Sequence, residues 1–204
     1  MTGLISYLAA EHISVVIDAT HPFAAKISRN AEAACSHLGL PLIVFTRQPW
    51  VKLREDCWHE VPDIESAASF VAVRKGRVFL AIGRQELGAF SDCKDAWFLV
   101  RAIDQPEGPL PPQSKIILQR GPFDFQHELQ LLRTHVIDYV VSKNSGGPAT
   151  YSKIEAARAI GIPVVMIGRP LKHTVPTVEH VDEVLAELSR LQVHLSMVRM
   201  ENQR

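Results

Sequence analysis

The segment Asp138–Ile167, DYVVSKNSGGPATYSKIEAARAIGIPVVMI, decides the fold class of this 204-residue chain. It begins with a short apolar stretch at 138–142, continues through a glycine-bearing turn into a helix-like stretch at 150–160, and ends with a second apolar stretch at 163–167. This order is typical of a strand, a helix and a parallel strand, because two parallel strands need a long crossover between them. The segment therefore predicts an α/β protein with a parallel sheet.

The same alternation extends along the rest of the chain. We expect further strands at 13–18, 41–46, 77–82, 96–102 and 115–119, and further helices at 3–11, 22–38, 63–75, 85–90, 125–135 and 182–191. Strands that are apolar throughout and are separated by helices indicate parallel sheets covered by helices on both faces. Two such series, divided near Gly76, predict two Rossmann-like lobes, an N-terminal lobe of residues 1–75 and a C-terminal lobe of residues 76–204.

Composition limits the classes of function. Lys and Arg number 22 and balance 22 Asp and Glu, so the chain lacks the cationic surplus of a general nucleic-acid binder. The cysteines, Cys35, Cys57 and Cys93, are far apart and lack metal-ligand spacing, which predicts reduced thiols, a cytoplasmic location and no metal site. We also expect no export signal and no association with a membrane, because no basic leader precedes an apolar segment and no apolar run reaches about 20 residues.

Polar, cationic and glycine residues follow five of the expected strands. The turns are Asp18–Phe23 (DATHPF), Thr46–Trp50 (TRQPW), Gly83–Gln85 (GRQ), Arg120–Phe123 (RGPF) and Ser142–Gly147 (SKNSGG). The carboxyl ends of parallel strands lie at one edge of a sheet, and ligands of such sheets bind there. One turn of this kind is equally well explained as a surface loop. The five together indicate an anionic ligand.

Three of these turns contain glycine and cationic residues that suit the binding of an anion. Gly146 and Gly147 let backbone N–H groups approach a ligand closely, Lys143 adds a positive charge, and Thr150 is expected to cap the following helix. Gly83 and Arg84, and likewise Arg120 before Gly121, combine a close backbone approach with a forked donor for phosphate or carboxylate. A solvated surface charge is the alternative interpretation of each.

The other two turns carry histidine and aromatic residues. Thr20 is expected to cap a helix that has Pro22 in its first turn, and His21 either binds a phosphate or carboxylate or lies at the surface. Arg47 is placed to hold a carboxylate beside the flat ring of Trp50. These residue types again suit an anionic ligand.

Five ordered motifs resemble the precorrin-6A reductase family of the cobalamin pathway, including its cobalt-precorrin-6A branch. They are VVIDATHPFAAKISRNAEAAC, the turn with Arg47, Pro49 and Trp50, FLAIGRQEL, ILQRGPF, and Asp138–Pro170. The resemblance covers about Ile13 to Pro170. It implies reduction of the precorrin-6A macrocycle to precorrin-6B, with NADPH as the cofactor. Members of the family begin with a strand and a GGT-type turn, so we expect the N-terminal lobe of this sequence to be incomplete.

The resemblance also implies roles for the residues of the five turns. The expected cofactor-binding residues are Thr20, His21, Pro22, Gly83, Arg84, Gln85, Asn144, Ser145, Gly146 and Gly147. The expected substrate-binding residues are Arg47, Trp50, Arg120 and Lys143, which suit a flat ring with many carboxylates. Lys143 and His21 are the candidates for delivering a proton, with water as the alternative. The site is expected in a cleft between the lobes of a monomer.

Two other functions remain compatible with the residues alone. One is a non-catalytic module that binds a tetrapyrrole or a nucleotide, and the other is a sugar-nucleotide transferase, a class that also uses two α/β lobes. Oxidation of NADPH in the presence of precorrin-6A would distinguish the reductase from both.

Overall fold

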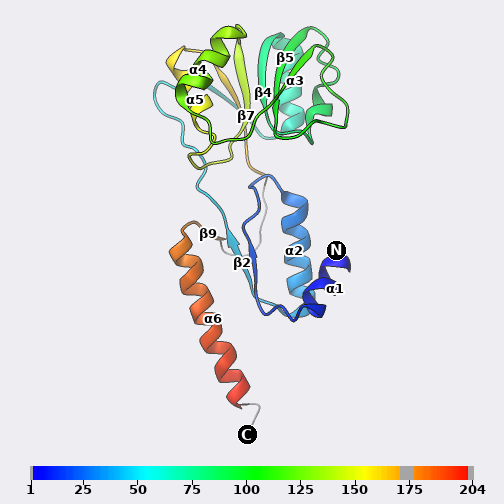
Figure 1. The fold of residues 1–204 in the computed structure, drawn as a ribbon, viewed down its shortest axis with the longest axis vertical. Coiled ribbons are helices and arrows are strands. Elements are labelled where there is room, and N and C mark those ends of the chain that lie inside the picture. Colours follow the sequence, from blue (N-terminus) through cyan, green and yellow to red (C-terminus); the bar gives the residue numbers. More distant parts are fainter. Residues whose placement is uncertain (1, 171–176, 202–204) are drawn as a thin grey trace. The chain divides into compact units, whose positions relative to one another are not determined.

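The computed structural model describes residues 2–170 and 177–201, and the chain forms two compact units (Figure 1). The small unit consists of Met1–Gln48 and Leu171–Arg204, and the large unit of Pro49–Pro170. Both units contain a parallel sheet with helices beside it, which confirms the predicted fold class. None of the helices in the described ranges is long and apolar enough to cross a membrane.

A six-stranded parallel sheet forms the centre of the large unit. Its strand order is β3-β8-β7-β4-β5-β6. The strands are β3 (Trp58–Val61), β4 (Gly76–Ala81), β5 (Ala96–Ala102), β6 (Ser114–Leu118), β7 (Tyr139–Lys143) and β8 (Val164–Ile167). The helices are α3 (Ile64–Arg74), the short 3-10 helix η1 (Leu87–Phe90), α4 (Phe125–Thr134) and α5 (Ser152–Ala159).

Apolar side chains cover both faces of this sheet. Phe79, Leu99 and Val140, from three neighbouring strands, are fully buried in one cluster with Ile154 of α5. Helices α4 and α5 lie side by side at one face, and strands separate them from α3 (Figure 1). Burial on both faces accounts for the nearly continuous apolar character of these strands.

The order of the strands reverses direction between β4 and β7. From β4 the chain proceeds outward through β5 to β6, whereas from β7 it proceeds the other way to β8. β4 and β7 are paired, with Ala81 opposite Ser142 at their carboxyl ends. In doubly wound sheets, the crevice beyond such a switch point is where ligands bind. The fold therefore places the turns after β4 and β7 at the expected binding position.

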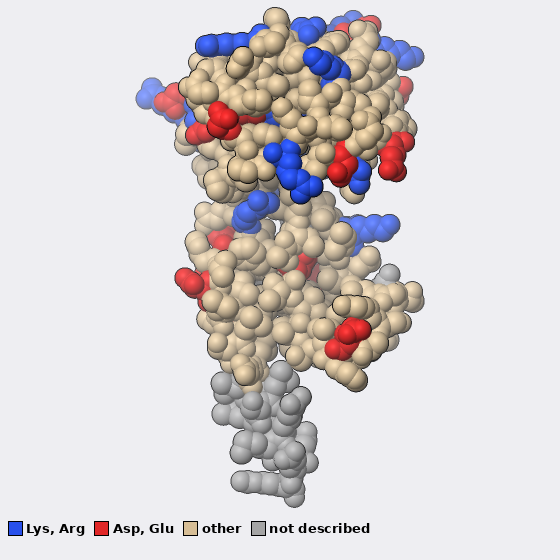
Figure 2. All heavy atoms as spheres, in the orientation of Figure 1, with Lys and Arg blue, Asp and Glu red and all other residues tan. Residues whose placement is uncertain are grey.

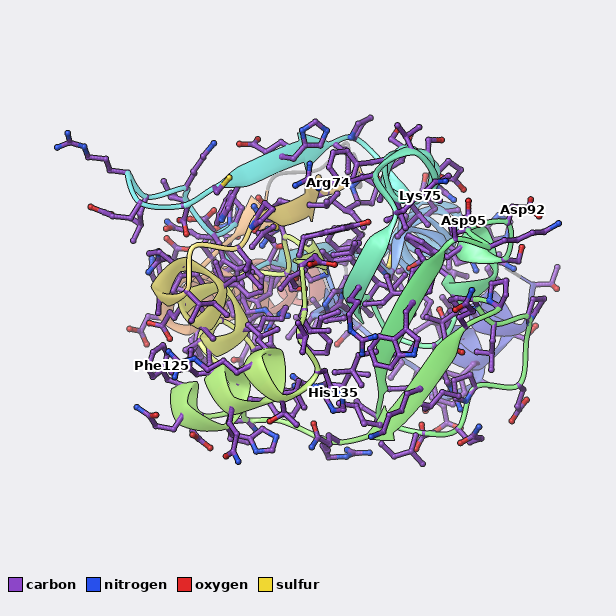
Figure 3. The ribbon with its side chains drawn as sticks, turned by 90° about the horizontal axis from the view of Figure 1, so that it is seen from above. Arg74, Lys75, Asp92, Asp95, Phe125 and His135 are labelled. Carbon is purple, nitrogen blue, oxygen red and sulfur yellow. The ribbon has the colours of Figure 1, made fainter. Side chains whose placement is uncertain are left out.

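An ion pair and a ring contact lie at the opposite edge of the large sheet. The Lys75 ammonium lies 2.8 Å from the Asp95 carboxylate (Figure 3). The His135 ring stacks on Trp97. Burial, with the nearby charges of Lys115 and Arg77, lowers the pKa of His135. These contacts are made within the unit, so this edge has a structural role.

The small unit contains a three-stranded parallel sheet with the order β1-β2-β9. The strands are β1 (Val16–Asp18), β2 (Leu42–Phe45) and β9 (Thr177–Val178), and the helices are α1 (Thr2–Ala10), α2 (Ala25–Leu38) and α6 (Val181–Glu201). Ala34 and Cys35 of α2 are buried together with Val44 of β2. Helix α2 ends at Gly39, whose left-handed backbone (φ 66°) is the C-cap expected for glycine.

The boundaries of the compact units differ from the expected lobes, 1–75 and 76–204. Residues 49–75 belong to the large unit, because β3 pairs with β8 from Trp58 opposite Val164 to Val61 opposite Ile167. Residues 177–201 belong to the small unit, because β9 pairs with β2 and α6 contacts both strands. The large unit thus includes the end of the expected N-terminal lobe, and the small unit includes the end of the expected C-terminal lobe. Neither β3 nor β9 was expected from the sequence.

Candidate functional site

The turns after β4 and β7 lie at the two sides of the switch point. Gly83, Arg84 and Gln85 follow β4 and are exposed. Lys143 is the last residue of β7, and its ammonium group forms an ion pair with the carboxylate of Glu86. This ion pair joins the two turns, so Gly83–Gln85 and Lys143 lie near one another at the switch point. Their role in binding a ligand stays a prediction.

Residues 144–150, named the glycine loop below, connect β7 to α5. Gly146 and Gly147 have φ angles of 68° and 74°, a region that residues with a Cβ atom rarely adopt. The Ser145 N–H donates to the Lys143 carbonyl at 2.8 Å, which tightens the start of the loop. Thr150 does not cap α5, because the helix begins at Ser152 with Tyr151 as an N-cap that makes no side-chain cap bond. The glycines therefore determine the shape of the loop.

Trp50 holds the glycine loop through three hydrogen bonds. Its backbone N–H donates to Asn144 Oδ1 at 2.7 Å, and Asn144 Nδ2 donates back to the Trp50 carbonyl at 3.0 Å. The indole Nε1–H of Trp50 donates to the Gly147 carbonyl at 2.8 Å. The Asn144 side chain and the indole N–H are thus used within the protein. Both residues were expected to contact a ligand, and the structure adds that they hold the loop in place.

The turn after β6 reaches the same loop. The Phe123 N–H donates to the Ala149 carbonyl at 3.3 Å. The backbone of Gly121 packs closely there, because a Cβ atom at this position would lie 3.3 Å from the Phe123 ring and 3.4 Å from Ala149 O. Arg120, which precedes Gly121, is exposed at this edge. The Arg120 turn and the glycine loop therefore belong to one structure.

Two further charged residues at this edge were not identified from the sequence. Asp104, after β5, lies 3.7 Å from the Arg84 guanidinium. Arg169, after β8, donates through Nε to the Asn144 carbonyl at 2.8 Å. A signal for Arg169 exists, because Ile-Gly-Arg occurs after a buried strand at 82–84 and again at 167–169.

Buried charges lie beneath the glycine loop, and sequence analysis did not single them out. Arg101 of β5 and Glu128 of α4 form a two-point ion pair with distances of 2.6 and 3.0 Å. Lys153 of α5 is 4% exposed and donates to the Thr150 carbonyl at 2.6 Å. The available signal is helical spacing, because Lys153 lies on the same helical face as Ala156 and Ala157, which are buried.

Basic and acidic side chains are scattered over the visible face of the large unit, most of which is uncharged (Figure 2). This agrees with the formal net charge of +0. The face shown has no continuous basic surface of the kind that a nucleic-acid backbone requires. An anion would therefore bind to local cationic turns of this unit and not to a broad basic surface.

In the small unit, Asp18 shapes the turn that follows β1. Its Oδ1 accepts from the Thr20 N–H at 3.0 Å and from the Thr20 hydroxyl at 2.6 Å. The Phe23 N–H donates to His21 Nδ1 at 3.2 Å, so a neutral His21 carries its proton on Nε2. Helix α2 begins at Ala25, and its N-cap, Ala24, makes no side-chain cap bond.

Two expectations about this turn are therefore wrong. Thr20 does not cap α2, because its hydroxyl bonds to Asp18. Pro22 precedes the helix instead of starting it. Arg47, after β2, is exposed at the same sheet edge as this turn, since β1 and β2 are parallel neighbours.

The expected site residues thus form two groups, one in each unit. The large unit holds Trp50, Gly83, Arg84, Gln85, Arg120, Lys143, Asn144, Ser145, Gly146 and Gly147, and the small unit holds Thr20, His21, Pro22 and Arg47. Both groups lie at the carboxyl edge of a parallel sheet. These features define a doubly wound α/β protein, a class that binds its ligands at this edge.

The chain belongs to the family described as precorrin-6x reductase CbiJ/CobK, whose model matches residues 1–189. It is 47% identical over 171 residues to the precorrin-6A reductase of Rhodobacter capsulatus, covering 83% of this chain and 68% of that protein. It is 45% identical over 187 residues to that of Rhodococcus erythropolis, covering 92% and 75%. The cobalt-precorrin-6A reductase of Priestia megaterium is 30% identical over 172 residues, covering 78% and 67%.

A solved structure of CobK precorrin-6A reductase has the same fold. It aligns with a TM-score of 0.87 at 43% identity and covers 93% of this chain and 76% of that one. The chain is accordingly a reductase, as the sequence motifs predicted. Membership in this family disfavours the sugar-nucleotide transferase.

Proposed function

We propose that this reductase acts on precorrin-6A in cobalamin biosynthesis and uses NADPH to produce precorrin-6B. The observation that carries the proposal is the switch-point site, with its glycine loop and flanking cations, in a chain of the precorrin-6x reductase family. The relatives at 44 to 47% identity are named precorrin-6A reductases, whereas those at 30 to 31% are cobalt-precorrin-6A reductases. This favours the cobalt-free substrate.

The residues of the large unit fit the phosphates of a dinucleotide. Gly146 and Gly147 have left-handed backbones in the turn before α5, and Arg84 lies across the switch point from them. The Ser152 hydroxyl, at the start of α5, is buried without a hydrogen-bond partner within the described structure. We assign Gly83–Gln85 and Asn144–Gly147 to the cofactor, together with Thr20, His21 and Pro22 of the small unit.

Cationic and aromatic residues suit the macrocycle. Arg47, Arg120 and Lys143 would bind its peripheral carboxylates, and Trp50 would contact the flat ring. The Lys143 ammonium is already paired with Glu86. A carboxylate of the macrocycle that binds Lys143 would contact the same ammonium group.

NADPH, when bound, supplies a hydride to an electron-poor carbon of the conjugated ring, and a proton completes the reduction at a second carbon. The protein contributes orientation and charge matching. His21 and Lys143 are the side chains proposed to deliver the proton, and water is the alternative. His21 is a donor through Nε2 when its ring is neutral.

The test is an anaerobic assay of the purified chain with precorrin-6A and NADPH, followed by the loss of absorbance of the reduced nicotinamide. We expect oxidation of one NADPH per macrocycle reduced, and slower oxidation of NADH. Binding of both ligands without oxidation would favour the non-catalytic module. Cobalt-precorrin-6A, assayed in parallel, distinguishes the two branches of the family.

A further inference from the structure

Lys153 lies inside the large unit at the point where the glycine loop is held. Its ammonium donates to the Thr150 carbonyl at 2.6 Å and lies 4.8 Å from the centre of the Trp50 ring. Trp50 in turn binds Asn144 and Gly147. The end of the loop therefore contacts Lys153 directly. Its middle, at Gly147, contacts Lys153 through the indole ring, and its beginning, at Asn144, is bound by the backbone of the same Trp50.

The charges around Lys153 do not balance. Glu128 of α4 and Arg101 of β5 face it, and these two residues are already paired with each other. Glu128 is fully buried and Arg101 is 7% exposed. On α5 itself, Arg158 is paired with Asp56. The three buried groups thus carry one surplus positive charge when Lys153 is protonated and none when it is neutral.

Burying an unbalanced ammonium is costly, so the proton on Lys153 is weakly held. Burial and the charge of Arg101 lower the pKa of Lys153 to about 7, although Glu128 opposes this shift. A neutral amine still donates to Thr150, but it loses the cation–π contact with Trp50 and the charge-assisted part of the hydrogen bond. Protonation therefore strengthens both contacts that hold the loop.

We propose that Lys153 is a positioning residue that couples proton uptake to the binding of an anionic ligand on the glycine loop. The inference rests on the proposed function, which assigns this loop to NADPH. A bound phosphate compensates the surplus charge of the cluster and thereby favours the protonated ammonium, which holds the loop in its binding conformation. Affinity for NADPH is consequently highest at low pH and falls as the pH rises above that at which free Lys153 loses its proton.

The test measures NADPH affinity by calorimetry between pH 6 and pH 9 for the wild type and two variants. Lys153→Met keeps the length of the side chain without charge, and Lys153→Arg keeps the charge without titrating in this range. In the wild type we expect affinity to fall by up to about tenfold per pH unit above pH 7. We expect weak affinity in Lys153→Met and a flatter profile in both variants.

The 2′-phosphate of NADPH also titrates, near pH 6, and it contributes equally to all three profiles. Lys153→Met thus serves as the reference, and its difference from the wild type isolates the lysine. A role confined to stability would lower affinity by the same factor at every pH. A Lys153→Met profile parallel to that of the wild type would overturn the inference.

A second measurement counts protons directly. Binding enthalpies at pH 7.5 in two buffers of different ionisation enthalpy give the number of protons taken up by the wild type and by Lys153→Met. Greater uptake by the wild type supports the inference, and equal uptake overturns it while leaving the proposed function intact. Failure of the wild type to bind NADPH at any pH would contradict the proposed function itself.

Discussion

At the residue scale, the site depends on cations that are held by specific partners. Lys143 is paired with Glu86, and Arg169 donates to the Asn144 carbonyl. Holding a long side chain in one geometry in advance reduces the entropy lost when a ligand binds. Single substitutions therefore test these residues directly.

Replacing Lys143 by alanine should weaken binding of the anionic ligands at the switch point. Loss of a charge-assisted hydrogen bond costs about 1.5–3 kcal/mol, which is at least about tenfold in affinity. Titrations with NADPH and with the macrocycle show which ligand Lys143 binds. Lys94→Ala, at an exposed position away from the switch point, is the matched control. Unchanged affinities for both ligands would remove Lys143 from the site.

Substitution within the buried pair Arg101–Glu128 should strongly lower the stability of the fold. Removing Glu128 leaves the buried charges of Arg101 and Lys153 without a counter-charge, so Glu128→Leu should lower the free energy of unfolding by about 3–5 kcal/mol. Urea denaturation measures this loss. The double variant Arg101→Met with Glu128→Leu should recover most of it, and additive losses would argue against this explanation. Glu187→Gln, in an exposed pair with Arg190, should change stability by less than about 1 kcal/mol.

At the element scale, helices α3 and α4 each begin at an aspartate N-cap that acts locally, whereas the caps expected at Thr20 and Thr150 do not form. Asp63 caps α3 and accepts from the Ser66 N–H at 2.8 Å, and Asp124 caps α4 and accepts from the His127 N–H at 2.9 Å. Both aspartates precede a helical stretch, as N-cap residues commonly do. These helices cover the sheet whose edge carries the site.

The cap at Asp63 should make α3 sensitive to acid. Hydrogen bonding to Ser66 lowers the pKa of Asp63, so the stabilisation is present above the ordinary aspartate pKa and is lost as the pH falls through the lowered value. Thermal unfolding of Asp63→Ala should show a lower midpoint than the wild type at pH 7, and a smaller difference at pH 2. Asp63→Asn retains an acceptor that does not titrate, so it should remain close to the wild type at pH 7. An equal deficit of Asp63→Ala at both pH values would contradict the assignment.

At the scale of the whole molecule, the two units differ in how the chain builds them. The large unit is one continuous segment, residues 49–170, whereas the small unit combines the beginning of the chain with its end. All six strands of the large sheet and its buried cluster come from the continuous segment.

A polypeptide of residues 49–170 should therefore fold by itself. We expect a cooperative urea transition monitored by circular dichroism, because the fragment contains its complete sheet and core. It should lack reductase activity, since Thr20, His21 and Arg47 are absent from it. A fragment of residues 76–170 is the control, and it should fail to unfold cooperatively because it lacks β3 and α3. Non-cooperative unfolding of 49–170 would show that the large unit needs the rest of the chain.

Local signals in the sequence were sufficient for most elements and for the polar turns that follow the strands. Apolar stretches such as 96–102 and 163–167 correspond to β5 and β8 within one residue, because burial on both faces demands continuous apolar sequence. Strand β3 has an apolar residue only at each end, around His59 and Glu60, and β9 has two residues. Neither carries a periodic pattern, so their existence depends on pairing with a distant strand.

The amino-acid sequence by itself determined the parallel α/β class, the turns that carry the cations and glycines, and the family resemblance. Tertiary structure alone decided which segments form each unit, since β3 and β9 acquire their hydrogen bonds only from strands remote in sequence. It also decided the role of Trp50, whose bonds to Asn144 join residues 94 positions apart. The proton equilibrium of Lys153 likewise arises from burial beside Arg101 and Glu128, which are contributed by two other elements. Such contacts depend on distances in space, which no local pattern of residues encodes.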